Sequence, residues 1–185
     1  MIEVIAPDFD AGEAEGVRAH VVMVEPEIPQ NTGNVARLCA GTGAWLHLVR
    51  PFGFQLEDRY VKRAGLDYWP AVRLSVHASV EALLPLLPRD RTVLFAARAQ
   101  ALHTDGLVVP GAVLVFGRES TGLPEEVLAA FPDRAVRIPT TGDVRSHNVA
   151  NCVAVGVYEA IRRSGWRGEA PMAGSVASPL QGPRS

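Results

Sequence analysis

Cysteine is scarce in this sequence: the 185 residues contain only Cys39 and Cys152, and no C-x-x-C pair occurs. A disulfide framework is therefore not expected, and both thiols are predicted to be buried and free in a reducing cytoplasm. Histidine and cysteine nowhere show the spacing of a zinc site. We predict no metal, and we assign His147 a hydrogen-bonding or stacking role rather than metal ligation.

Long apolar runs and nucleotide-binding signatures are also missing. No uninterrupted apolar stretch is long enough to cross a bilayer. The acidic first 19 residues lack a cationic leader followed by an apolar segment, so they do not resemble a signal peptide. We expect no membrane association. Neither G-x-G-x-x-G nor G-x-x-x-x-G-K-[S/T] occurs, which argues against a standard dinucleotide or P-loop site.

Excess positive charge is the third absence. The chain has 18 Lys and Arg against 20 Asp and Glu, and its formal net charge is −2. This balance argues against a protein that coats nucleic acid non-specifically. Cations still cluster locally, in two groups that are each typical of a solvated face: Arg59, Lys62 and Arg63, and Arg162, Arg163 and Arg167.

What is present is the composition of one ordinary globular domain, with 48% hydrophobic and 21% charged residues. Residues 1–19 are acidic and aperiodic, and they are predicted to be a flexible N-terminal extension. Residues 20–167 are predicted to form the domain. Residues 168–185 are rich in Gly, Pro, Ser and Ala, which indicates a disordered tail.

Apolar runs alternate with helical periodicity along the domain. Strands are predicted at 20–24, 45–49, 71–76, 92–97, 112–116 and 135–138. Helices are predicted after Asn31 or Thr32 up to Gly43, from Ser79 to Leu87, after Pro124, and after Ser146 or Asn148. The fold class is therefore α/β, a mostly parallel sheet with helices on both faces.

The densest polar stretch is the segment 140–148, which joins the last predicted strand to the last helix. Its backbone N–H groups and side chains next to a helix start can bind a polar ligand. The helix has an apolar face and a second stripe containing Asn151, Val155 and Tyr158. The stripe is typical of an interface or a site wall, but an ordinary helix packed on a sheet also explains it.

A second polar group follows the first predicted strand. Asn34 and Arg37 are three residues apart, so they share one helix face near the carboxyl end of that strand. Ligands bind at this edge of open α/β sheets. Two interpretations stay open from these residues alone: a capped helix with one surface arginine, or an anion site that uses the guanidinium fork.

Three segments, taken together in this order, favour a functional site over a purely structural role: EPEIPQNTGNVAR (25–37), VFGRESTGL (115–123) and RIPTTGDVRSHNVANCVAVGVYE (137–159). Together they resemble the three motifs of SPOUT-class RNA 2'-O-methyltransferases, and they are most similar to the small single-domain branch that acts on the tRNA wobble position. Segment 62–68 (KRAGLDY) also resembles that branch. The resemblance covers His20 to Arg167.

The resemblance implies a C-terminal trefoil knot (the SPOUT fold), a cytoplasmic homodimer with Tyr158 near its interface, and tRNA bound through its anticodon stem-loop. It implies S-adenosylmethionine as methyl donor and no metal. The residues that match the donor-binding positions are Ala97, Gly117, Ile138 and Ser146. Those that match the catalytic positions are Arg37, with Asn31 to orient it or the ribose, Glu119 and Asn148.

The predicted function is thus 2'-O-methylation of the wobble nucleotide, cytidine or modified uridine, in the anticodon loop. One alternative is methylation of another tRNA or rRNA ribose. A second is a non-catalytic RNA-binding factor with the same fold. The sequence leaves open the tRNA identity, the subunit that supplies Arg37, whether Arg37 is a true general base, and the role of the N-terminal extension.

Overall fold

The fold is built on one sheet of parallel strands, seen in a computed structural model that describes residues 4–54, 66–166 and 168. Seven strands lie in the order β3-β2-β1-β6-β4-β7-β5, and every neighbouring pair is parallel. The strands are β1 (His20–Val24), β2 (Trp45–Val49), β3 (Arg73–His77), β4 (Thr92–Phe95), β5 (Ala101–Leu102), β6 (Val113–Phe116) and β7 (Ala135–Arg137). The predicted parallel α/β class is confirmed.

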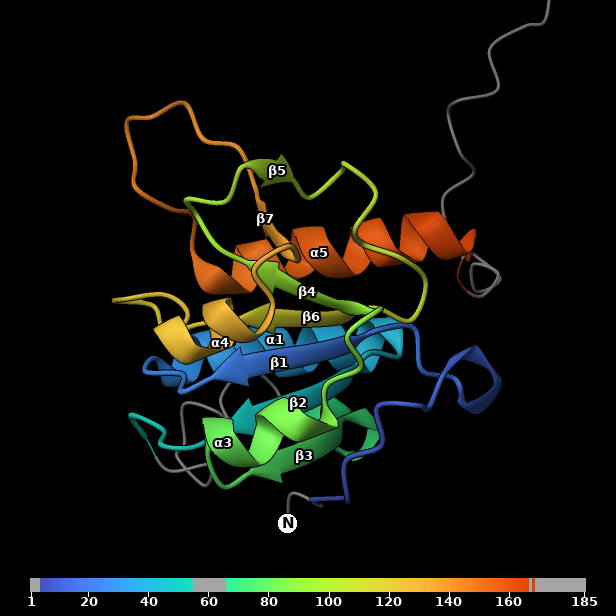
Figure 1. Cartoon of the computed structure of the whole chain (residues 1–185). Helices are drawn as coiled ribbons and strands as arrows, with labels where there is room; N and C mark the ends of the chain where they lie inside the picture. Colours follow the sequence, from blue (N-terminus) through green and yellow to red (C-terminus); the bar gives the residue numbers. More distant parts are fainter. Residues whose placement is uncertain (1–3, 55–65, 167, 169–185) are drawn as a thin grey trace, which may run out of the picture.

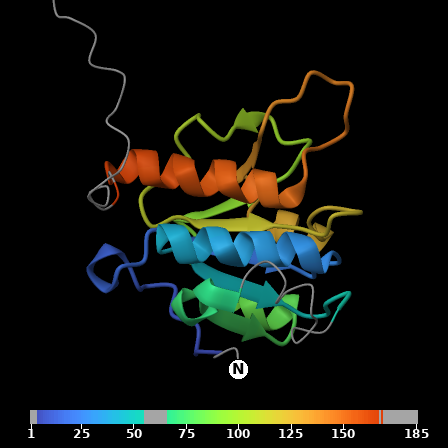
Figure 2. The ribbon, with the colours of Figure 1, turned by 180° about the vertical axis from the view of Figure 1, so that it is seen from behind.

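Helices cover both faces of the sheet. The α-helices are α1 (Pro29–Thr42), α3 (Val80–Leu83), α4 (Glu125–Ala130) and α5 (Val149–Ser164), and the 3-10 turns are η1 (Glu13–Glu15), η2 (Leu66–Ala71) and η3 (Leu84–Leu86). Figure 1 shows α3 and α4 on one face, and Figure 2 shows α1 and α5 side by side on the other. Each face has its own buried apolar cluster.

The strand predictions hold with small shifts, and one strand was missed. β1 and β2 have the predicted bounds, whereas β3 runs over Arg73–His77 rather than 71–76. β5 has two residues, Ala101 and Leu102, which is too short for a periodic signal in sequence. It forms because β7 offers it a free edge.

The start of α1 differs from the prediction. The helix begins at Pro29 after Ile28, so neither Asn31 nor Thr32 is its cap. Proline suits the first helical position because its ring already holds a helical φ and its missing N–H would have no partner there. At α5 the open choice resolves to Asn148, whose side chain accepts from Ala150 N and Asn151 N at 2.9 and 3.4 Å.

Helix α5 lies very close to the sheet because of Gly156. A Cβ built there would lie 2.8 Å from Cζ of Phe95. The residues next to it on the same face, Val153, Val157 and Ala160, are fully buried, as the apolar periodicity predicted.

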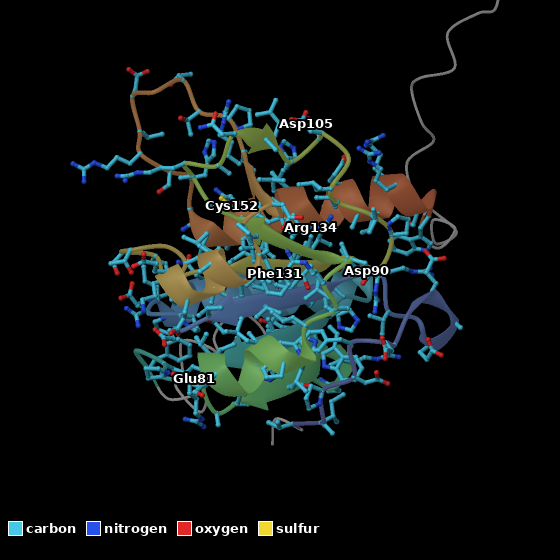
Figure 3. All side chains as sticks on the ribbon, in the orientation of Figure 1. Glu81, Asp90, Asp105, Phe131, Arg134 and Cys152 are labelled. Atoms are coloured by element: carbon cyan, nitrogen blue, oxygen red, sulfur yellow. The ribbon has the colours of Figure 1, made fainter. Side chains whose placement is uncertain are left out.

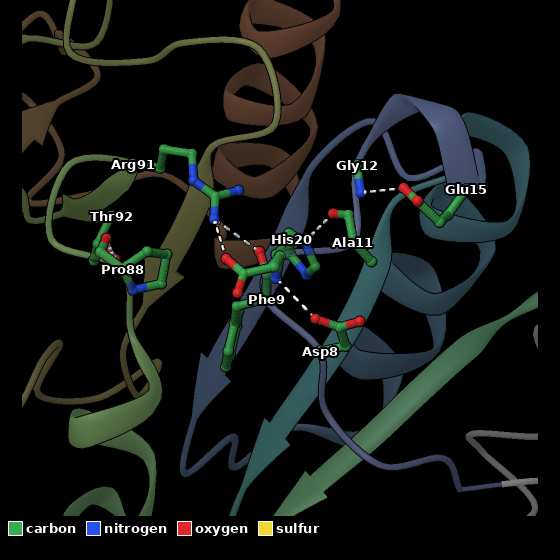
Figure 4. Close-up of polar contacts among 10 residues, drawn as sticks. Asp8, Phe9, Ala11, Gly12, Glu15, His20, Pro88, Arg91 and Thr92 are labelled. Atoms are coloured by element: carbon green, nitrogen blue, oxygen red, sulfur yellow. Dashed lines mark hydrogen bonds and ion pairs between the residues drawn. The ribbon is translucent and has the colours of Figure 1, made fainter.

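The N-terminal segment is packed, contrary to the prediction of little structure before Gly16. Phe9, Ala11 and Val17 are buried, and the Ile5 N–H donates to the carbonyl of Leu74 at 2.8 Å. Figure 4 shows Arg91 bonding the carbonyl of Phe9. The apolar residues of this segment are too sparse to show a period, and only the folded sheet supplies the surface that they bury against.

Phe9 covers a row of three buried histidines on adjacent strands. His20 bonds the carbonyl of Ala11 through Nε2 at 3.0 Å and His47 through Nδ1 at 3.0 Å, and His47 bonds His77 at 3.2 Å. Because His20 Nε2 must donate to a carbonyl, each ring in the row is a neutral Nε2–H tautomer. Burial lowers the pKa of all three rings, and that of His47 well below its usual value.

Some predictions fall outside the described residues. These are the cations at 59–63, most of the KRAGLDY segment, Arg167 and, apart from Gly168, the tail 168–185. Within the described ranges, no helix combines the length and apolarity needed to span a bilayer.

Candidate functional site

The site lies at the carboxyl edge of the sheet, on the left of Figure 1. Strands β6, β4 and β7 are neighbours and parallel, so the residues that follow them meet at this edge. Gly117 follows β6, Ile138 follows β7, and Ala97 lies two residues beyond β4. The topology therefore brings together three of the four residues expected at the methyl donor.

The loop after β6 folds back tightly over Gly117. Arg118 and Gly122 bond each other's main chain at 3.0 and 2.9 Å. A Cβ at Gly117 would lie 2.1 Å from the carbonyl carbon of Gly122, so no other residue fits. This turn aims Glu119 at the start of α1.

Glu119 links the second motif to the first. Its Oε2 accepts from the backbone N–H of Glu27 at 2.8 Å, and its Oε1 accepts from Nδ2 of Asn31 at 2.9 Å. A longer contact of 3.4 Å joins Oε1 to the N–H of Ile28. The carboxylate thus accepts hydrogen bonds from backbone N–H groups of the segment that leads into α1 and from a side chain in the first turn of α1.

Asn148 links the third motif to the same network. Its Nδ2 donates to Oδ1 of Asn31 at 3.0 Å, while its own Oδ1 caps α5. Asn31 is only 5% exposed, so its amide is fixed by these two partners. Asn148, Asn31 and Glu119 form one hydrogen-bonded line that joins all three motifs.

Sequence reasoning missed two further braces between the first and second motifs. Glu27 accepts from the N–H and hydroxyl of Ser120 at 3.0 and 2.8 Å. Glu25, whose φ of 51° is unusual for a non-glycine residue, pairs with Arg118. The signal available in sequence was an acidic residue directly after one buried strand and a basic residue two positions after another.

Arg37 lies on the exposed face of α1, away from the hydrogen-bonded line. Burial raises the pKa of the Tyr68 hydroxyl, and the positive charge of Arg37 partly offsets this rise. Tyr68 in turn donates its hydroxyl to the carbonyl of Gly33 at 3.1 Å. Asn31 bonds Glu119 and Asn148 rather than Arg37 in the described part of the chain, so any orienting effect of Asn31 on Arg37 is indirect.

The connection 138–148 borders a shallow hollow beside α5. The hollow is open to solvent and is lined by Ile138, His147, Asn151, Cys152 and Val155. Figure 3 marks Cys152 on the first turn of α5, and burial raises the pKa of its thiol. His147 bonds the carbonyl of Pro139 at 3.1 Å, as a hydrogen-bonding role predicts. Ser146, the fourth expected donor residue, is exposed.

The second stripe of α5 is exposed in the single chain. Tyr158 is 57% exposed and Val155 38%, and both are large apolar side chains. Within the described ranges, no three His, Cys, Asp or Glu side chains are grouped so as to hold a metal ion.

Comparison with known proteins gives one family. The model of the SpoU rRNA Methylase family matches residues 18–158. A tRNA (cytidine(34)-2'-O)-methyltransferase from Burkholderia ambifaria is 46% identical over 154 residues, which cover 82% of this chain and 99% of that protein. An enzyme of the same name from Methylovorus glucosotrophus is 45% identical over 149 residues, or 80% of this chain and 97% of the relative.

Solved structures agree. One that concerns the 2-OH methylation of C/U34 on tRNA is 50% identical, with a TM-score of 0.73, and covers 80% of this chain and 96% of its own. An AdoMet-bound rRNA methyltransferase from Sinorhizobium meliloti is 22% identical, with a TM-score of 0.72; it covers 85% of this chain and 60% of its own, and shares the fold.

Proposed function

Because the chain belongs to the SpoU rRNA Methylase family, we propose that it methylates the ribose 2'-hydroxyl of the wobble nucleotide, a cytidine or modified uridine, in the tRNA anticodon loop. The observation that carries this proposal is the line Asn148–Asn31–Glu119, which unites the three motifs at the ligand-binding edge of the sheet. The relatives that match nearly over their whole length are named for this reaction. The chain acts in the cytoplasm, where this substrate is modified.

The methyl donor is S-adenosylmethionine, bound at the ends of β4, β6 and β7. The residues present fit it: the ends of three neighbouring parallel strands bring Ala97, Gly117 and Ile138 to one edge, and a hollow lined in part by Cys152 and Val155 adjoins Ile138. Because Gly117 has no side chain, the backbone of Gly122 and Leu123 packs directly against the end of β6. Ser146 borders the donor from the connection to α5. When bound, the donor supplies an electrophilic methyl group on a sulfonium, so the reaction needs no metal.

The protein's task is to position the ribose and to help its hydroxyl lose a proton, because alignment supplies much of the rate of such transfers. Arg37 binds the RNA phosphate next to the target and stabilises the developing alkoxide. A literal base role is disfavoured, since a guanidinium has a pKa above about 12. Asn31, Glu119 and Asn148 hold the start of α1, and with it Arg37, at a fixed place relative to the strand ends.

The C-terminal part of the chain, from the connection 138–148 through α5, forms the trefoil knot of the family. Two observations support this topology. β7 inserts between β4 and β5, which precede it in the chain, and His103 N donates to the carbonyl of Arg137 at 3.0 Å. In both Figure 1 and Figure 2 the connection 138–148 lies at the same corner as the link from β4 to β5.

The active form is a homodimer that pairs through the second stripe of α5. Val155 and Tyr158 are exposed in one chain, and the hollow beside Val155 opens on the same surface. Exposed apolar groups that adjoin a site mark such an interface. Sedimentation of Tyr158→Asp against the unmodified chain tests this pairing: the charge is expected to give monomers.

The test of function is methyl transfer from labelled S-adenosylmethionine to unmodified total tRNA, with mass spectrometry to locate the product. We expect a 2'-O-methyl group at the wobble nucleotide. Arg37→Ala should lower kcat about 100-fold or more, as loss of one charge-stabilising donor does, and Arg73→Ala, on β3, serves as the control. A methyl group at another tRNA or rRNA ribose would show that the substrate is a different nucleotide. Absence of donor binding would favour the non-catalytic alternative.

A further inference from the structure

The loop that leaves β2 carries a cation and two aromatic rings within five residues. The guanidinium carbon of Arg50 lies 4.8 Å from the centroid of the Phe52 ring. The rings of Phe52 and Phe54 stack with centroids 5.8 Å apart and planes 19° apart. Phe52 also packs against the core cluster, whereas Arg50 is exposed and Phe54 half-buried. The group is therefore anchored to the core through its central ring, Phe52, and open to solvent at Arg50.

This loop is fixed to the site described above. The Arg50 N–H donates to the carbonyl of His77 at 3.1 Å, and the Gly53 N–H donates to that of Pro26 at 3.0 Å. A Cβ at Gly53 would lie 2.8 Å from the carbonyl oxygen of Glu27, so the loop after β2 is in direct contact with the segment that leads into α1. The N–H of Glu27 is also the group that Glu119 binds. One short path joins the aromatic rings to the hydrogen-bonded line.

We infer that Arg50, Phe52 and Phe54 form a stacking platform for an unpaired base of the substrate RNA. This inference rests on the proposed function. Unpaired RNA bases are bound by stacking on aromatic rings and guanidinium planes. A chain of net charge −2 has little bulk attraction for RNA, so it depends on local contacts of this kind. The carboxyl edge of β2 places the platform on the same edge as the strand ends that hold the donor.

The chain offers a matched control at the opposite edge. Arg18 lies 5.0 Å from the ring centroid of Trp166, beyond the far end of α5 and ahead of β1. This cation–aromatic pair has the chemistry of the Arg50–Phe52 pair without its place. Loss of its ring should not change RNA binding.

The experiment compares Phe54→Leu, Phe54→Trp and Trp166→Leu in the full chain. Binding of an unmodified tRNA anticodon stem-loop is measured beside binding of S-adenosylmethionine. We expect Phe54→Leu to weaken RNA binding about 5- to 150-fold, the range for one stacked base, with donor binding unchanged. Phe54→Trp should keep RNA binding because it keeps a ring, and Trp166→Leu should match the parent chain. Unchanged RNA affinity in Phe54→Leu overturns the platform.

A second measurement uses only the unmodified protein, so it does not depend on whether a variant folds. Stem-loops with the fluorescent base 2-aminopurine at single loop positions are titrated with the unmodified protein. Quenching at one loop position is expected, and quenching at none overturns the inference. Methyl transfer to tRNA without either effect would refute the platform and leave the proposed function standing, whereas absence of methyl transfer would count against the function itself.

Discussion

The line Asn148–Asn31–Glu119 can run in only one direction, and this makes a sharp prediction. Asn148 Oδ1 accepts from N–H groups of α5, so its Nδ2 must donate to Oδ1 of Asn31. Asn31 must then present Nδ2 to Glu119, which also accepts from the backbone N–H of Glu27. Glu119 therefore faces one close donor at each of its oxygens, and a third donor, the Ile28 N–H, lies at a longer 3.4 Å from Oε1.

Glu119→Gln removes one of these acceptors. The amide has a single oxygen, so either Asn31 Nδ2 or the Glu27 N–H loses its partner. An unpaired buried donor costs about 1–3 kcal/mol, and the remaining bond loses its charge-assisted share. We expect a loss of about 2 kcal/mol in the free energy of unfolding. Urea unfolding with an unchanged m-value measures it, and kcat for methyl transfer should fall as the start of α1 shifts.

Asn31→Asp removes the donor instead and places two carboxylates 2.9 Å apart. The double variant Glu119→Gln with Asn31→Asp restores the pattern, because the new amide can donate to Asp at position 31 and accept from the Glu27 N–H. We expect the two changes together to be about 2 kcal/mol less costly than the sum of the single changes. Additive losses would refute the assigned direction of the line.

Three further predictions concern packing and protonation. Gly156→Ala should cost about 1–3 kcal/mol because its Cβ meets Phe95 at 2.8 Å, whereas Gly41→Ala, on open α1 surface, should gain about 0.5–1 kcal/mol in the same urea assay. Burial lowers the pKa of the three histidines under Phe9 from 6.5, so stability should be full above pH 6.5 and fall as the pH drops below it; a flat profile of urea midpoints from pH 7.5 to 5 would contradict this. The hydrogen bond from Arg162 lowers the pKa of Glu159 to about 2. The stability that ionised Glu159 contributes should therefore be present above pH 4.5 and be lost as the pH falls toward 2. The acid-unfolding curve of Glu159→Gln should lack this loss.

Sequence alone determined the fold class and all the described strands except β5, and it narrowed the cap of α5 to Ser146 or Asn148. Buried parallel strands such as His20–Val24 and Trp45–Val49 appear as continuous apolar runs, and alternation with helices implies a parallel sheet. Gly43 and Asn148 mark helix ends by local backbone chemistry. The reaction class also came from sequence, through the order of the three motifs.

Tertiary structure decided which motif residues touch. Asn31 and Asn148 are 117 positions apart, and no local rule pairs their amides. The order β3-β2-β1-β6-β4-β7-β5 brings them together, because strand neighbours are chosen by the packing of the whole sheet. The burial of Phe9 and the row of histidines have the same cause. A sparse segment shows no period of its own, and only a completed sheet provides the surface that makes its docking favourable.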